Sequence, residues 1–185
     1  KLDMRMDQSQ KLDAHYVVNE YSYEDLVRIF KVYGEEKYAS SIAKGIIKNR
    51  PINTTLELTE IIKENVPFSY KKDHHPSRKV FQAIRIEVND ELNVFEKSLN
   101  QALELIDING RIEVITFHSL EDKIVKSIFR KYSDVDPMVQ GLPVIPDEYK
   151  PKIKLVNRKP ILASEEELRE NSRSHSAKLR VIERI

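Results

Sequence analysis

His118 and Ser119 are the residues of this 185-residue chain whose side chains and position best suit chemistry. They follow residues 111–117, a run of β-branched and aromatic residues after Asn109-Gly110, which predicts a strand. Ligands of open α/β sheets bind beyond the carboxyl ends of strands, so both side chains are candidates for the lining of a substrate pocket. A structural interpretation stays open, in which Ser119 and Asp122 cap the following helix and His118 only hydrogen-bonds locally.

Hydrolysis by His118, Glu121 and Asp122 is a weaker alternative, because no nucleophile accompanied by a base and an orienting group is visible. The chain has no cysteine, which excludes a disulfide framework, thiol catalysis and cysteine-ligated zinc. His74 and His75 are adjacent, and no carboxylate lies at metal-ligand spacing from them. We therefore predict no metal site.

Asp3, Arg5 and Asp7 form an alternating charged segment near the start of the chain. An extended backbone would place the three side chains on one side, where the two carboxylates are candidates for catalysis. The alternative interpretation, which we favour from the sequence, is a solvated tail.

A case for a nucleic-acid partner depends on local clusters, because the net charge is only +1. The densest basic cluster lies within residues 71–85, where Lys71, Lys72 and His74 accompany four candidates for RNA contact: His75, Arg78, Lys79 and Arg85. A weaker second set consists of Arg173, His175, Lys178 and Arg180. The competing interpretation is an ordinary solvated loop and helix face.

The elements that position these residues change class near residue 106. Apolar residues recur at helical spacing through residues 22–105, with a polar loop expected at residues 68–77. Ser22 with Asp25 and Ser164 with Glu167 resemble capping boxes that begin helices. Beyond residue 106 we predict a helix after His118 and three strands, at residues 111–117, 153–156 and 178–185.

The chain is therefore expected to have three parts: a polar lead-in at residues 1–20, a helical domain at residues 21–105 and a mixed unit at residues 106–185. No apolar run approaches the ~20 residues of a membrane span, and the polar start is not a secretory signal. These features favour a cytoplasmic protein with no membrane partner.

Seven strings of the chain, in this order, resemble one protein family. They include Leu-Asp-Met-Arg-Met-Asp and Phe-His-Ser-Leu-Glu-Asp and lie at residues 2–7, 33–43, 75–76, 81–92, 110–126, 159–160 and 176–180. The family is that of the bacterial 16S rRNA cytosine-N4 methyltransferases known as RsmH or MraW. The resemblance implies an α/β fold, in which the C-terminal strands of a Rossmann-like methyltransferase sheet accompany an all-helical inserted domain.

The resemblance also implies S-adenosylmethionine-dependent methylation of the N4 amine of a cytidine, a step of ribosome biogenesis with 16S rRNA or the small ribosomal subunit as partner. Such a transfer needs an aligned amine, a hydrogen-bond acceptor beside it and a pocket for the unstacked base. On this basis the candidate catalytic residues are Asp3, Asp7, His118 and Ser119.

The chain departs from the family pattern where the cofactor binds. The family's glycine-rich loop is absent, since the four glycines are scattered: Gly34, Gly45, Gly110 and Gly141. We therefore expect a C-terminal fragment that is inactive alone, has no S-adenosylmethionine site, and self-associates or dimerises through an exposed sheet edge. The alternative function is a non-catalytic RNA- or protein-binding helical module.

Overall fold

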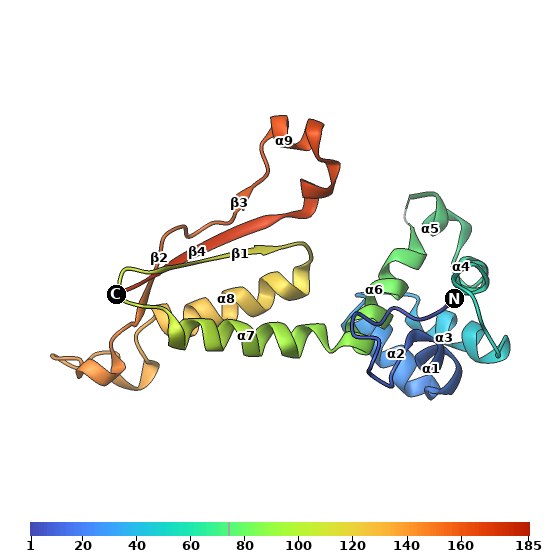
Figure 1. The fold of residues 1–185 in the computed structure, drawn as a ribbon, viewed down its shortest axis with the longest axis horizontal. Coiled ribbons are helices and arrows are strands. Elements are labelled where there is room, and N and C mark those ends of the chain that lie inside the picture. Colours follow the sequence, from blue (N-terminus) through green and yellow to red (C-terminus); the bar gives the residue numbers. More distant parts are fainter. Residues whose placement is uncertain (74) are drawn as a thin grey trace. The chain divides into compact units, whose positions relative to one another are not determined.

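The computed structural model describes residues 1–73 and 75–185, so His74 of the basic cluster lies outside the described residues. The chain forms two compact units, Lys1–Glu91 and Leu92–Ile185, coloured blue to green and green to red in Figure 1. The first unit is helical and the second combines helices with an antiparallel sheet. The predicted mixed α/β class is confirmed.

The first unit is built from short helices around one apolar core. Its helices are α1 (Ala14–Glu20), α2 (Tyr23–Val32), α3 (Ala39–Lys48), α4 (Thr55–Glu64), α5 (Phe68–Asp73) and α6 (Pro76–Asn89). The cap predicted at Ser22 is confirmed, because its hydroxyl accepts a hydrogen bond from the backbone N–H of Asp25. Leu26, Ile29 and Phe30 of α2 are fully buried, so the apolar stripe read from the sequence is the packed face.

Two helices of this unit were not expected from the sequence. Helix α1 is capped by Asp13, whose carboxylate accepts a hydrogen bond from the backbone N–H of Tyr16. It is only 7 residues long, so its apolar face is too short to show a helical period. Helix α5 replaces the loop predicted at residues 68–77 over most of its length.

The start of the chain is not the solvated tail that we favoured. Leu2 is fully buried in the core of the helical unit. The side chain of Asn89 donates to the Met4 carbonyl and accepts from the Met6 backbone N–H. These contacts hold the segment against α6, because each satisfies a backbone group that would otherwise need water.

The second unit places two helices on one face of a small sheet. Its main elements are α7 (Glu91–Leu105), β1 (Arg111–Thr116), α8 (Ser119–Ser133), β2 (Ile153–Leu155), β3 (Ile161–Leu162), α9 (Glu165–Glu170) and β4 (Lys178–Arg184). The hydroxyl of Tyr132 in α8 donates to Asn100 in α7, and Figure 1 shows these helices side by side along the sheet. Helix α7 packs Leu99 and Leu103 into this core, although the sequence placed it with the helical domain.

Strand β4 is the centre of the sheet, since β1, β2 and β3 all pair with it antiparallel. It follows that β1 and β2 run parallel to each other, and α8 connects them. The three predicted strands are confirmed. The additional strand β3 pairs with β4 beyond the interruption at residues 156–160. It has only two residues, too few to show an alternation of apolar and polar side chains in the sequence.

Strand β1 presents an open edge, because β4 is its only partner among the described residues. Ile115, 57% exposed, projects from it. Unpaired edges beside apolar surface favour association between copies, so light scattering is expected to show the apparent mass of the chain rising with concentration. An Ile115→Lys variant should shift the chain toward the monomer, whereas Leu105→Lys, also an exposed apolar position but at the end of α7 and outside β1, should not. A monomer at every concentration would contradict this expectation.

Candidate functional site

The carboxyl end of β1 passes into α8 through a tight reciprocal cap. His118 Nδ1 accepts a hydrogen bond from the Glu121 backbone N–H at 3.4 Å. In return, Glu121 Oε2 accepts from the backbone N–H groups of Phe117 at 2.8 Å and His118 at 3.2 Å. The capping residue is therefore His118 and not Ser119, which is the first residue of the helix.

The cap fixes the tautomer and direction of the His118 ring. Because Nδ1 accepts a hydrogen bond, the ring proton is assigned to Nε2 in the neutral form. This Nε2 atom is buried and has no hydrogen-bond partner among the described residues. It lies 3.3 Å from Glu121 Oε1, but without hydrogen-bond geometry. The imidazole of His118 thus stabilises the turn from β1 into α8. The side chain exposed to solvent at this strand end is that of Phe117, which is 53% exposed.

A nearly buried ion pair joins the first turn of α8 to β4. Arg180 Nε lies 2.7 Å from Asp122 Oδ1, and Arg180 Nη2 lies 3.3 Å from Oδ2. Each side chain is only 11% exposed. Hydrogen bonding from Arg180 lowers the pKa of the Asp122 carboxyl, and the Lys178 ammonium, at 3.8 Å, acts in the same direction. The pair holds the helix on the sheet beside the capped strand end.

Asp3 and Asp7 belong to the helical unit, whereas His118 and Ser119 belong to the other. Arg5 binds both carboxylate oxygens of Asp3, at 2.7 and 3.0 Å, and holds the pKa of that carboxyl well below its usual range. Asp7 accepts from the backbone N–H and hydroxyl of Ser9. The backbone between them is not extended, since Met4 has a φ of 66°.

The basic cluster of the helical unit is partly engaged within the protein. Lys79 Nζ donates to the Glu35 carbonyl at 3.1 Å. Arg85 makes a two-bond ion pair with Glu91, at 2.8 and 3.0 Å. His75 precedes α6 without a side-chain capping bond. Arg78 is exposed and makes no ion pair with the described residues, so it is the cation of the cluster most available to a phosphate.

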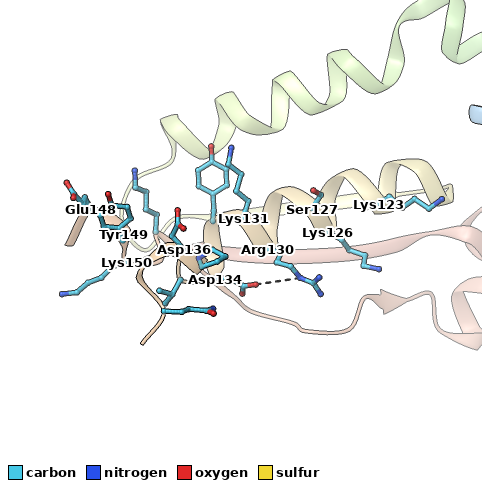
Figure 2. Close-up of a pocket in the computed structure, with 15 residues that line it drawn as sticks. Lys123, Lys126, Ser127, Arg130, Lys131, Asp134, Asp136, Glu148, Tyr149 and Lys150 are labelled. Atoms are coloured by element: carbon cyan, nitrogen blue, oxygen red, sulfur yellow. Dashed lines mark ion pairs between the residues drawn. The ribbon is translucent and has the colours of Figure 1, made fainter. Parts of the chain in front are cut away.

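The second unit contains cations on α8 that were not singled out from the sequence. They border an open hollow of about 740 Å³ shown in Figure 2, between α8 from Lys123 onward and residues 134–152. Its charged lining is mixed, with Asp134, Asp136 and Glu148 among the lysines. The hollow extends along α8 from Lys123 to the C-terminal end of the helix, and its lining does not include Phe117, His118 or Ser119.

A comparison with models of protein families assigns the whole chain to one family. The model of the MraW methylase family matches residues 1–185. The chain belongs to the MraW methylase family. The resemblance carried by the seven strings is thereby confirmed, and with it a methyltransferase assignment.

The glycines of this MraW methylase chain are used for helix packing and turns. A Cβ at Gly34 would lie 2.7 Å from the Lys79 carbonyl oxygen, and one at Gly45 would collide with the Asn65 amide. Gly110 packs in the same way against Ile106, and Gly141 occupies a turn with a φ of 96°. Within the described residues no glycine-rich loop follows a strand, so these residues do not fit the S-adenosylmethionine that the family implies.

The chain alone is accordingly expected to bind S-adenosylmethionine weakly or not at all. Calorimetry at micromolar protein should show no saturable heat on titration with the cofactor. The full-length protein, titrated in parallel, serves as the positive control. Tight one-to-one binding by residues 1–185 would contradict the assignment of the glycines to packing.

In residues 1–73 and 75–185, no three His, Asp or Glu side chains gather in a way that could hold a metal ion. None of the helices in the described part has the length and apolar character needed to cross a membrane.

Proposed function

We propose that this methylase transfers a methyl group from S-adenosylmethionine to the N4 amine of a cytidine in 16S rRNA. The proposal assigns that activity to the full-length protein and expects residues 1–185 alone to be inactive. The observation that carries it is the capped carboxyl end of β1 in a chain of the MraW methylase family. Strands β1 and β2 run in the same direction on either side of β4 and are joined by α8, so the turn from β1 into α8 resembles the strand ends beyond which ligands of α/β sheets bind.

We propose that the target base stacks on the ring of Phe117. A cytosine must leave its stack before a methyl group can reach its amine. An exposed aromatic ring at the strand end offers a face on which the displaced base can stack. Phe117 was missed as a site residue because it reads as the last residue of a hydrophobic strand.

His118 and Glu121 are positioning residues in this proposal. Their reciprocal cap fixes the backbone N–H groups of Phe117 and His118, so the Phe117 ring is presented from a rigid turn. Ser119 begins the helix directly behind this turn. The role proposed for the imidazole is therefore to shape the site, with its buried Nε2 directed away from solvent.

The helical unit supplies an RNA contact at Arg78. In the full-length protein, the combined Arg78→Ala, Lys79→Ala and Arg85→Ala variant should bind ribosomal substrate more weakly. For this variant, the slope of the logarithm of the association constant against the logarithm of the salt concentration should be smaller in magnitude by about one unit. The reason is that one phosphate contact is lost. Lys79 and Arg85 already form hydrogen bonds with other groups of the protein. Arg78→Ala alone should therefore account for most of the change.

Filter binding across a salt series measures this effect. Lys44→Ala, which removes one exposed charge on α3, is the matched control for the single Arg78→Ala variant and should leave affinity and slope unchanged. If the triple variant keeps the wild-type affinity and slope, the cluster is a solvated surface and the RNA is held elsewhere.

Analysis of the reaction product tests the function itself. The full-length protein is incubated with small ribosomal subunits and isotope-labelled S-adenosylmethionine, and the rRNA is digested to nucleosides. Mass spectrometry should find the label in cytidine methylated at N4. Label at carbon 5, on another base or on protein would overturn the proposed substrate while leaving the family assignment intact.

A further inference from the structure

Four cationic side chains converge on one small cavity in the second unit. Lys126 and Arg130 come from α8, Arg158 from the interruption between β2 and β3, and Arg180 from β4. This four-cation cavity has a volume of about 90 Å³ and is completed by Phe129, Leu155 and Asn157. The described residues that line it include no carboxylate.

The protein holds the walls of this cavity in place. Asn157 Nδ2 donates to the carbonyls of Lys159 at 2.7 Å and Leu179 at 3.2 Å, and its Oδ1 accepts from the Val181 backbone N–H at 2.7 Å. These three bonds fix the turn that carries Arg158. Arg180 is fixed by Asp122, which occupies Nε and Nη2, and its Nη1 has no hydrogen-bond partner among the described residues.

The remaining cations keep their charge available. Lys126 and Arg158 make no hydrogen bond or ion pair with the described residues. Arg130 approaches Asp134 at only 4.0 Å, the dashed contact in Figure 2, where Lys126 and Arg130 extend from the same side of α8. Asp122 offsets the charge of Arg180, whereas Lys126, Arg130 and Arg158 are exposed and leave an excess of positive charge around the cavity. This excess favours an anionic ligand.

Size and geometry select the kind of anion. A volume of 90 Å³ corresponds to about three water molecules, which suits one phosphate group. Planar guanidinium groups match phosphate oxygens with paired hydrogen bonds. Lys126 and Arg130 also border the larger hollow, where Lys150 and Lys152 lie among the carboxylates of the mixed lining.

We propose that the four-cation cavity binds one backbone phosphate of the RNA substrate. Naming RNA as the source of the phosphate rests on the proposed function. The position supports it, because Asp122, the partner of Arg180, lies one turn of α8 from the His118 cap. A phosphate held here anchors the strand on the same helix that begins at the base-binding end of β1.

The test uses the whole chain and a short fluorescently labelled single-stranded RNA, with binding followed by anisotropy across a salt series. The cavity variant combines Lys126→Ala, Arg130→Ala and Arg158→Ala and leaves the buried Asp122–Arg180 pair intact. The matched control removes the same charge from exposed lysines elsewhere: Lys44→Ala, Lys48→Ala and Lys97→Ala. Circular dichroism and hydrogen exchange of α8 confirm that both variants are folded.

We expect the cavity variant to lose roughly tenfold in affinity and about 0.7 units of salt slope, the value for one phosphate of a single strand. Each single substitution should give much of that loss, because the three cations share one phosphate. The control variant should keep the wild-type slope. RNA with uncharged methylphosphonate linkages should bind wild type and cavity variant equally.

Other outcomes overturn the proposal. Equal slopes in the cavity and control variants would mean that the RNA responds only to overall charge. Binding of inorganic phosphate to the wild-type chain, with RNA affinity unchanged in the cavity variant, would assign the cavity to a free anion. Because this test needs no methyl transfer, its result is independent of the product analysis, so failure of the cavity and failure of the proposed substrate are distinguishable.

Discussion

Replacing Asp122 with alanine is expected to lower the free energy of unfolding of the second unit by about 3 kcal/mol, because Arg180 would then be a buried charge without a partner. The side chains of Asp122 and Arg180 are each 11% exposed and share two hydrogen bonds. The measurement is hydrogen exchange of amides in α8 and β4, which reports on this unit while the helical unit stays folded.

Two controls separate the ion pair from charge loss in general. Asp147→Ala removes an exposed carboxylate paired with Lys150. It should change the free energy of unfolding obtained from hydrogen exchange by less than about 0.5 kcal/mol. The double variant Asp122→Leu with Arg180→Met should recover most of the loss, since well-packed apolar residues can replace a buried pair. A full effect in the double variant would show that Asp122 acts through contacts other than Arg180.

The pH dependence of the same exchange follows from the pKa of Asp122. Arg180 first, and then Lys178, lowers this pKa in the folded state below its unfolded value. The pair therefore contributes fully above the unfolded pKa of about 4 and loses its contribution as the pH falls through the folded value. The Asp122→Ala variant should lack this acid-sensitive component.

Replacing Phe117 with alanine is expected to reduce kcat/KM of the full-length protein on ribosomal substrate by roughly 10- to 100-fold. Loss of one aromatic–base stack costs about 1–3 kcal/mol, which corresponds to roughly 5- to 160-fold and includes this range. Phe117→Tyr keeps a stacking face and should stay near wild type. Initial rates of methyl incorporation over a range of subunit concentrations provide the measurement.

Ile115 and His118 supply the matched comparisons for Phe117. Ile115→Ala truncates an exposed apolar side chain two residues earlier on the same sheet face and should leave kcat/KM within a few-fold. His118→Asn retains a good helix cap and should do the same, as expected of a positioning residue. Equal losses in Ile115→Ala and Phe117→Ala would assign this face to packing.

Local signals in the sequence predicted much of the second unit. The β-branched run after Gly110 predicted β1, and the spacing of Ser164 and Glu167 predicted the cap of α9, confirmed by a bond from the Glu167 backbone N–H. The cap of α8 was placed one residue late, because His118 is an uncommon capping residue and Ser119 a common one. Such choices depend on backbone angles that composition does not specify.

The four-cation cavity has no local signature at all. Its members are spread from residue 126 to residue 180 and meet only because β2 and β4 pair beside α8. Arg180 was singled out within a basic set, but its pairing with Asp122 joins residues 58 positions apart. Long-range pairing of this kind is set by sheet register, which a single sequence read segment by segment does not reveal.

The rRNA of cells that lack the full-length protein tests the central claim most directly. 16S rRNA is isolated from the deletion strain and from strains complemented with the wild-type or the Phe117→Ala gene, and its nucleosides are quantified by mass spectrometry. We predict that cytidine methylated at N4 is absent from the deletion strain, restored by the wild-type gene and reduced in the variant. An unchanged level of N4-methylated cytidine in 16S rRNA after deletion would contradict the account.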